Sequence, residues 1–323
     1  MHDLTHHDHQ PDHDDHAHEH EHHHHDEFGP LAELVTLRDW LRYTVTRFNR
    51  AGLHFGHGCD DAYGEAVWLL LRALALPLDR LEPFLDASIT AEEREQLQAL
   101  IERRVDERVP TAYLVNEAWL GDFSFYVDSR VIVPRSFLAE LLEDGLEPWL
   151  PEDAELRQVL DLCTGSGCLA ILLAHAYPEA RVVGVELSED ALAIAQRNVE
   201  EYGLEQQVEL VRSNLFSGLA GQRFDLILSN PPYVTQQAMD SLPAEYLHEP
   251  RMALAAGDDG MDIVRRILAE ARQHLTPEGV LVVEVGHNRE QVEAAFPQLP
   301  LIWLPTSGGD DMVFLVQAAD LPE

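Results

Sequence analysis

The chain has 323 residues, enough for two domains with full-sized cores, and 46% of them are apolar. It carries 58 acidic against 22 basic side chains, a formal net charge of −36, and all 22 are arginine. A field of this sign repels nucleic acid, and no apolar run reaches membrane-spanning length, so neither nucleic-acid readout nor a membrane role is expected. The acid excess fits a surface adapted to high salt, a basic protein partner, or both.

Three cysteines, Cys59, Cys163 and Cys168, are too few for a disulfide framework. The first residues lack the basic patch and apolar stretch of a secretory signal. We therefore expect reduced thiols in a cytoplasmic protein, with Cys163 and Cys168 as small packing residues.

Residues 1–30 are predicted to form a disordered tail rich in histidine and aspartate. The first 27 hold twelve histidines, nine acidic residues and no basic one, with no apolar periodicity. Runs such as residues 22–25 could bind Zn²⁺ or Ni²⁺ weakly, but they supply no defined ligand geometry, so no metal centre is predicted. The rest of the chain keeps 49 acidic and 22 basic side chains, a charge of −27.

Residues 31–118 are predicted to form a helical domain. Apolar residues recur at helical spacing over 36–50, with Gly52 as the stop, and again over 60–76. A capping box that starts at Thr90 opens a third helix, which runs to about Val109. Three tryptophans are expected in the core: Trp40, Trp68 and Trp119.

Residues 119–135 are predicted to form a linking β-hairpin. Apolar and polar residues alternate over 123–133, with a central turn at Asp128-Ser129 and a stop at Pro134.

Residues 136–323 alternate strands and helices, which predicts an α/β fold with a mostly parallel, doubly wound sheet. The last two apolar runs, 301–304 and 312–317, are joined too closely for a crossover and should pair antiparallel. Five parallel strands and this pair make seven. The parallel strands are expected at 158–162, 181–186, 208–212, 224–229 and 279–285, and the helices at 168–176, 189–202 and 261–275.

A glycine-rich loop follows the first of these strands, from Asp161 through Thr164, Gly165 and Gly167. Such a loop lets a ligand approach the backbone closely, and Glu186, at the end of the next strand, can accept hydrogen bonds from ribose hydroxyls. The loop and the acid alone fit NAD as well as S-adenosylmethionine.

Two further positions favour S-adenosylmethionine. Asp161 could meet the ammonium group of a methionine moiety, which a dinucleotide lacks, and Asn214 follows the third strand where an adenine edge would lie. Asn230-Pro231-Pro232-Tyr233 then ends the fourth strand with a rigid turn, at the sheet edge where α/β proteins bind ligands. One amide and one aromatic ring in such a turn suit a planar nitrogen held still.

In this order, these residues resemble a class I S-adenosylmethionine-dependent methyltransferase that acts on amide or amino nitrogens. Further stretches resemble the protein-glutamine N-methyltransferases, in the branch that modifies a large-subunit ribosomal protein (protein three). The resemblance covers roughly residues 31–318. The stretches lie at 36–41, 56–58, 108–114, 125–128, 130–136 and 248–250.

The sister branch, which methylates peptide-chain release factors, usually carries an acid in place of Phe137 and lacks the 36–41 opening. The family usually has aspartate at the position of Asn214.

The resemblance implies methyl transfer from S-adenosylmethionine to N5 of a glutamine in a basic ribosomal protein. Asn230 and the Pro231 carbonyl would accept the N–H groups of the substrate amide, with Pro232 and Tyr233 packed beside it. Asp161, Thr164, Gly165, Gly167, Glu186, Asn214 and Asn230 would bind the cofactor.

Alternatives remain open at this point. The same chemistry could act on a release factor, an adenine N6 is also planar and conjugated, and the chain could be a non-catalytic binder whose tail handles metal. Arg135 could lie at the substrate entrance or pair with a surface acid, while His57 and His248 are expected to be satisfied loop histidines.

Overall fold

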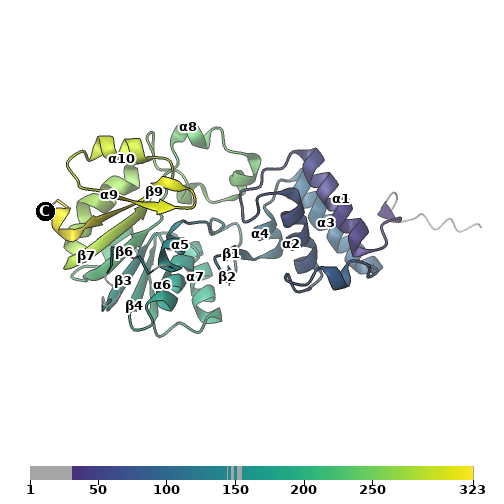
Figure 1. Cartoon of the computed structure of the whole chain (residues 1–323), viewed down its shortest axis with the longest axis horizontal. Coiled ribbons are helices and arrows are strands. Elements are labelled where there is room, and N and C mark those ends of the chain that lie inside the picture. The colour runs from purple at the N-terminus through teal and green to yellow at the C-terminus, as the bar shows by residue number, and fades with distance from the viewer. Residues whose placement is uncertain (1–30, 144, 147–148, 151–154, 323) are drawn as a thin grey trace, which may run out of the picture. The chain divides into compact units, whose positions relative to one another are not determined.

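The computed structural model of the chain describes residues 31–143, 145–146, 149–150 and 155–322, so the predicted tail lies outside the described residues. Residues Thr36–Glu323 form one compact unit, which contains both the helices of the N-terminal half and the large sheet (Figure 1). The divisions expected near residues 118 and 135 fall within this unit and stay a prediction.

Three helices of the N-terminal half confirm the expected pattern. Helix α1 (Leu37–Ala51) begins at a capping box between Thr36 and Asp39 and ends at Gly52, whose φ of 57° only glycine adopts at little cost. Helix α3 opens with the predicted Thr90 capping box. The bounds of the remaining N-terminal helices are Ala62–Ala73 for α2, Ala91–Asp106 for α3 and Thr111–Val115 for the short α4.

The tryptophan prediction holds for two of three positions. Trp40 and Trp68 are buried, whereas Trp119 is 39% exposed and donates its indole N–H to Glu117. The prediction that Trp119 lies in the core is wrong, because Trp119 is the exposed middle residue of a strand in a two-stranded ribbon.

That ribbon corrects the predicted hairpin. Strands β1 (Ala118–Leu120) and β2 (Phe123–Phe125) pair antiparallel around Gly121, whose φ is 57°. A hairpin does occur at the start of the predicted range, and Phe123–Phe125 is a strand, but the turn at Asp128-Ser129 and the return strand to Val133 are wrong. The alternation there arises because Val127, Val131 and Val133 are all buried against helical residues, without ladder pairing in the described residues.

The main sheet has seven strands in the order β5-β4-β3-β6-β7-β9-β8. The first five in this order are parallel, and β9 pairs antiparallel with both β7 and β8, as the sequence predicts. The bounds are β3 (Gln158–Leu162), β4 (Arg181–Glu186), β5 (Val208–Arg212), β6 (Phe224–Ser229), β7 (Leu275–Glu284), β8 (Ile302–Thr306) and β9 (Gly309–Gln317).

Helices cover both faces of this sheet, because its central strands are apolar on both sides. Successive residues of β3 illustrate the two-sided core: Val159 packs into one cluster and Leu160 into the other. On the first face lie α5 (Leu138–Glu143), α6 (Cys168–Ala176) and α7 (Glu189–Glu201), and on the second α9 (Asp262–Glu270) and α10 (Arg289–Ala295).

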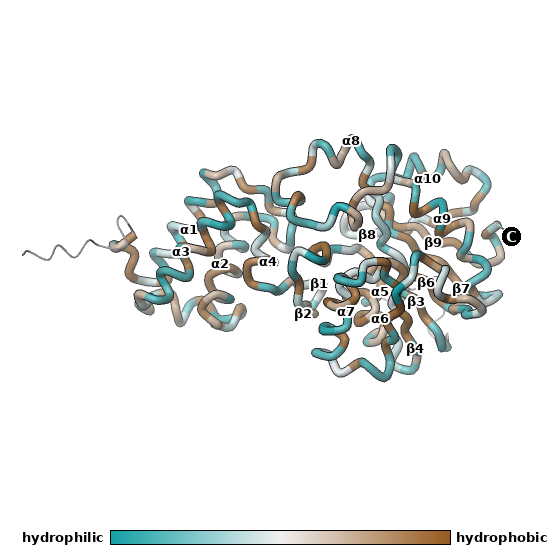
Figure 2. Tube along the Cα trace, turned by 180° about the vertical axis from the view of Figure 1, so that it is seen from behind, coloured by the Kyte–Doolittle hydropathy of each residue, from teal (hydrophilic) through white to brown (hydrophobic). Residues whose placement is uncertain are grey.

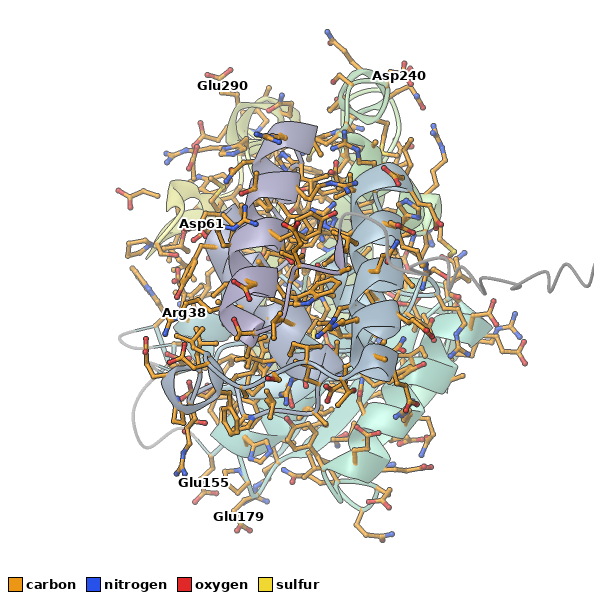
Figure 3. All side chains as sticks on the ribbon, turned by 90° about the vertical axis from the view of Figure 1, so that its right-hand side faces the viewer. Arg38, Asp61, Glu155, Glu179, Asp240 and Glu290 are labelled. Carbon is orange, nitrogen blue, oxygen red and sulfur yellow. The ribbon has the colours of Figure 1, made fainter. Side chains whose placement is uncertain are left out.

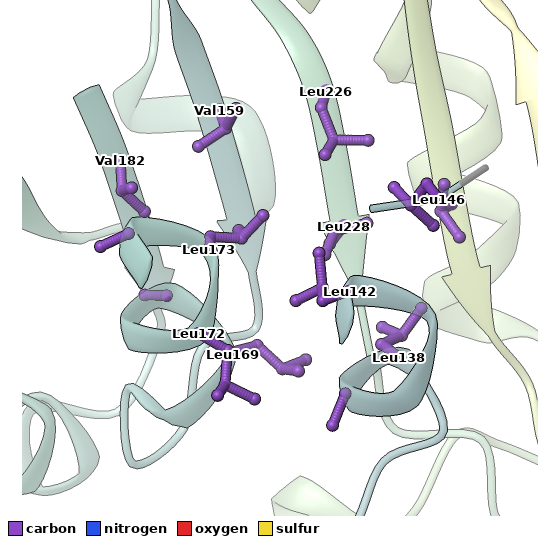
Figure 4. Close-up of a cluster of buried hydrophobic side chains, with 14 of the residues drawn as sticks. Leu138, Leu142, Leu146, Val159, Leu169, Leu172, Leu173, Val182, Leu226 and Leu228 are labelled. Atoms are coloured by element: carbon purple, nitrogen blue, oxygen red, sulfur yellow. The ribbon is translucent and has the colours of Figure 1, made fainter. Parts of the chain in front are cut away.

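Figure 4 shows the first cluster, with leucines of α5 and α6 facing Val159, Val182, Leu226 and Leu228 of the sheet. Each fully buried leucine contributes about 1.5–3 kcal/mol relative to an exposed one. The brown strands inside a teal exterior in Figure 2 reflect the same pattern along the whole unit.

Two details differ from expectation in the C-terminal half. The helix predicted over 261–275 stops at Glu270 and continues as a 3₁₀ turn over Ala271–His274. Strand β7 therefore starts at Leu275, before the expected Gly279. Ser188 caps α7 as predicted, through a hydrogen bond from the Ala191 N–H.

Acidic side chains outnumber basic ones in the sequence, and several are exposed. Figure 3 labels five exposed acids: Asp61, Glu155, Glu179, Asp240 and Glu290. All three cysteines are free thiols. No helix in the described part of the chain is long and apolar enough to cross a membrane.

Candidate active site

A cavity lies at the carboxyl ends of four parallel strands. The last residue of β4, Glu186, lines it together with residues from the loops after β3, β5 and β6, which are Gly165, Asn214, Asn230 and Pro232. The structure thus brings five predicted site residues around one hollow, at the edge where α/β sheets bind ligands.

The glycine loop is tight for an identifiable reason. Gly165 and Gly167 have φ values of 56° and 80°, and a Cβ on Gly167 would lie 3.1 Å from the Cβ of Ala195 in α7. The Thr164 N–H reaches the Val185 carbonyl at 2.9 Å, which joins the loop to β4. Gly165 lines the cavity, whereas Thr164 and Gly167, also predicted to bind the cofactor, do not line it.

Glu186 is held by backbone donors. Its Oε2 accepts from the Gly165 N–H at 3.0 Å, and its Oε1 accepts from the N–H groups of Leu187 (2.8 Å) and Ser188 (2.9 Å). The carboxylate therefore links the glycine loop to the start of α7 while it lines the cavity, the position expected of a ribose acceptor.

Asp161 is fully buried beneath the loop and does not line the cavity. Its Oδ2 accepts from the Thr164 hydroxyl, whereas Oδ1 has no hydrogen-bond partner among the described residues. Burial raises the pKa of this carboxyl to about 7. An orphaned acceptor of this kind fits a nearby donor group of a ligand.

Asn214 is exposed at the rim of the cavity. Its side-chain Oδ1 accepts from the Arg266 guanidinium at 3.0 Å. The aspartate that the family resemblance implies at this position would form an ion pair with Arg266, and the asparagine keeps the hydrogen bond.

Asn230, Pro231 and Tyr233 leave β6 in different directions. The Asn230 Nδ2 donates to the Arg135 carbonyl at 3.2 Å, while Pro231 is buried. The Tyr233 ring packs so closely on Gly286 that a Cβ there would lie 2.8 Å from the ring. The Tyr233 hydroxyl donates to Glu284 at 3.4 Å, and burial raises the tyrosine pKa above its usual value.

Tyr233 lines a second cavity. Its walls include Arg135, Phe137 and Glu284, together with Glu140 and Glu143 of α5. Asn230 and Pro232 of the Asn-Pro-Pro-Tyr turn thus line the first cavity, and Tyr233 lines the second.

The acid partner of Arg135 is buried rather than on the surface. The guanidinium forms a two-fold hydrogen bond with Glu249, at 2.7 Å and 2.6 Å. Burial alone would raise the Glu249 pKa, but the neighbouring His57 and Arg135 lower it to about 2. A role for Arg135 in substrate binding stays a prediction.

The two histidines differ from each other. His248 is satisfied, since its Nε2 lies 2.8 Å from the Glu107 carbonyl. His57 is buried with neither ring nitrogen hydrogen-bonded among the described residues, and its Nε2 lies 3.7 Å from Glu249. The expectation of a satisfied histidine is therefore wrong for His57.

Sequence reasoning missed Glu249 and Glu284 as members of the site. Glu249 stands in one of the stretches that carry the family resemblance, but its buried partner Arg135 is 114 positions away. Glu284 is the last residue of an apolar strand, where an acid is unusual and could have been noticed.

The sheet order, the glycine loop and the acid at the end of β4 define a class I methyltransferase, and residues 142–258 match the family model of the methyltransferase small domain. Curated relatives narrow the class. The ribosomal protein uL3 glutamine methyltransferase of Neisseria gonorrhoeae is 56% identical over 90% of this chain and 96% of its own length. Those of Burkholderia pseudomallei (56%, over 89% and 96%) and Bordetella pertussis (53%, over 90% and 97%) are similar.

The chain therefore belongs to the family of ribosomal protein uL3 glutamine methyltransferases. Of the two branches that the motifs left open, these relatives favour the ribosomal one over the release-factor one.

Proposed function

We propose that the protein transfers a methyl group from S-adenosylmethionine to the side-chain nitrogen N5 of a glutamine in ribosomal protein uL3. One observation carries this proposal: relatives more than half identical over nearly their whole length are named for this reaction. The residues at the carboxyl edge of the sheet also suit methyl transfer to a glutamine amide.

The first cavity suits the methyl donor, which supplies an electrophilic methyl group on a positively charged sulfur. Glu186 would accept the ribose hydroxyls, and the bend at Gly165 gives the ligand access to the backbone. Asn214 at the rim would contact the adenine edge. Asp161 does not line the cavity, so its unpartnered Oδ1 would reach the ammonium group through a water molecule.

Asn230 would hold the substrate amide. A glutamine amide is a weak nucleophile because its nitrogen lone pair is delocalised into the carbonyl. The Asn230 Oδ1 and the Pro231 carbonyl would each accept one amide N–H, which favours positive charge on nitrogen and aims it at the methyl group.

The balance of the reaction needs no strong base. A nitrogen–carbon bond forms while the carbon–sulfur bond breaks, and its electron pair stays on sulfur. The methylated nitrogen is acidic and releases one proton to water.

The charge of the chain suits the partner. Outside the first 27 residues it is −27, and a basic ribosomal protein would be drawn to such a surface. The helical segment 31–118 would select the substrate, and the reaction would take place in the cytoplasm. Weak Zn²⁺ or Ni²⁺ binding by the tail is a separate prediction, and no metal cluster occurs within the described residues.

A competition assay tests the proposal. The full-length protein is mixed with methyl-labelled S-adenosylmethionine and equal amounts of uL3 and a release factor from the same source, and mass spectrometry locates the label. We expect label on a glutamine of uL3. Label on the release factor alone would contradict the choice of substrate, and label on neither would contradict the activity.

A further inference from the structure

The orientation of the Asn230 amide is set by a backbone carbonyl. An asparagine side chain can present either oxygen or nitrogen in a given direction, and only its hydrogen bonds decide which. The Arg135 carbonyl can only accept, so its 3.2 Å contact fixes Nδ2 toward itself and turns Oδ1 away. The position of this carbonyl therefore determines where the Asn230 acceptor points.

The carbonyl belongs to residues 133–137, which we call the Arg135 segment. This segment lies between β2 and α5, directly before Leu138, and no strand or helix is assigned to it. Its backbone is thus not held by a regular ladder, and other groups must fix it.

Glu249 fixes the segment on its N-terminal side. The Oε1 atom accepts from the Val133 N–H at 2.9 Å and from the Arg135 guanidinium at 2.7 Å, and Oε2 accepts from the same guanidinium at 2.6 Å. The side chain has no exposed surface. A fully buried carboxylate with three charge-assisted or backbone donors is strongly directional.

Glu284 fixes the segment on its C-terminal side. Its Oε2 accepts from the Ser136 hydroxyl at 2.5 Å and from the Phe137 N–H at 3.0 Å. Its Oε1 accepts from the Tyr233 hydroxyl at 3.4 Å, so the same carboxyl also contacts the end of the Asn-Pro-Pro-Tyr turn. Glu284 is 2% exposed.

We propose that two buried carboxylates, Glu249 and Glu284, are positioning residues that fix the Arg135 segment and thereby the orientation of Asn230. They bind N–H groups on either side of the Arg135 carbonyl and come from separate parts of the fold, the loop after β6 and the end of β7. The inference rests on the proposed role of Asn230 as the acceptor for the substrate amide.

The chain supplies a matched control for Glu249. Glu245 is also buried, lies in the same loop and carries the same charge, but it contacts the His54 N–H at 3.0 Å and Arg104 at 3.3 Å, away from the Arg135 segment. Glu249→Gln and Glu245→Gln therefore remove equivalent charges, and only the first loosens the carbonyl that holds Asn230.

The first readout is kinetic, on full-length protein at saturating uL3 and S-adenosylmethionine. We expect Glu249→Gln to lower kcat by about 10-fold to 100-fold, because small misplacement of a reacting group has effects of this size. Glu249→Asp keeps the charge but shortens the reach, so an intermediate loss is expected, and it serves if Glu249→Gln does not fold. Glu245→Gln should lower Tm similarly but leave kcat within about 2-fold, and equal kcat values for the two Gln variants would overturn the proposal.

The second readout does not depend on the substrate. In ¹⁵N NMR spectra, the side-chain NH₂ signals of Asn230, assigned with Asn230→Ser, should shift in the Glu249 variants and stay unchanged in Glu245→Gln. Unchanged Asn230 signals in the Glu249 variants would overturn the positioning role. Shifted signals in a protein that methylates no uL3 would instead count against the proposed function alone.

Discussion

The first cavity has two sides, which we name after their proposed roles: the cofactor side, with Gly165 and Glu186, and the amide side, with Asn230 and the Arg135 segment that it contacts. The contacts that hold each side span different distances along the chain. On the cofactor side, Glu186 accepts from the N–H groups of its neighbours Leu187 and Ser188 and from Gly165, 21 positions away. On the amide side, Asn230 contacts a carbonyl 95 positions away, and that carbonyl is held by acids 114 and 147 positions from the groups that they bind. Short-range geometry builds the first side, and long-range side-chain contacts build the second.

This difference predicts which step of the reaction a substitution on each side should affect. A change in the glycine loop should disturb cofactor binding through strain in the backbone itself. A change on the amide side should leave the cofactor bound and slow the transfer step.

The largest effect is expected at the asparagine. Asn230→Ala removes the acceptor for the substrate amide, so kcat should fall by about 100-fold to 1000-fold, as when one preorganised partner of a reacting group is lost. Single-turnover transfer to uL3 measures it, with the Kd for S-adenosylmethionine as the control. A kcat within about 3-fold of the unaltered protein would show that Asn230 does not hold the amide.

The cofactor side is tested at Gly167. An alanine there adds a Cβ 3.1 Å from Ala195 and keeps a φ of 80°, so we expect the Kd for S-adenosylmethionine to rise about 10-fold. Gly203→Ala is the matched control, because its φ is 67° and a Cβ there has no atom within 4 Å. Calorimetry should find an altered Kd in the first variant only, and equal Kd values would place the loop outside the cofactor site.

The acid at the end of β7 is tested by pH. Burial raises the pKa of Glu284 to about 7, with Tyr233 and Ser136 as its side-chain partners. Between its ordinary pKa of 4.5 and 7 the folded state holds a proton that the unfolded chain releases, so the free energy of unfolding falls as pH rises through this window.

Glu284→Gln should remove about 1–3 kcal/mol of this fall, measured by urea unfolding at the two ends of the window. Asp161, whose pKa burial also raises to about 7, would keep part of the slope in the variant. An identical slope in both proteins would show that Glu284 does not gain a proton on folding.

The smallest effect is expected at Asn214. Asn214→Asp restores the residue usual in the family and pairs its charge with Arg266, while offering an acceptor to an adenine amino group. The Kd for S-adenosylmethionine should fall about 3-fold, since exposed charged contacts contribute little. Weaker binding would mean that the amide itself contacts the adenine.

Much of the cofactor side was predictable from the sequence. The ends of β3, β4, β5 and β6 agree with the predicted strands. Strands β3, β4 and β6 are mostly buried apolar runs, whereas β5 at the sheet edge buries only Val208 and still keeps the predicted bounds. Ser188 and Thr90 were recognisable as helix caps because their partners lie three residues away.

The amide side was not predictable from the sequence, because the partners of Arg135, Asn230 and Tyr233 come from remote segments. Nothing near Arg135 in the sequence distinguishes a buried acid such as Glu249 from the many acids on the surface. The misplaced hairpin has a related cause, since Val127 and Val131 alternate with polar residues but pack on helices rather than in a ladder.

The identity of the methylated atom is the decisive test of whether the protein methylates a glutamine side-chain nitrogen of uL3. Labelled uL3 is isolated after reaction with methyl-labelled S-adenosylmethionine and hydrolysed in acid, which cleaves side-chain amides but leaves methylated lysine and arginine intact. We expect the label to be released as methylamine and the modified position to become glutamate. Label retained on a lysine or an arginine would contradict this expectation.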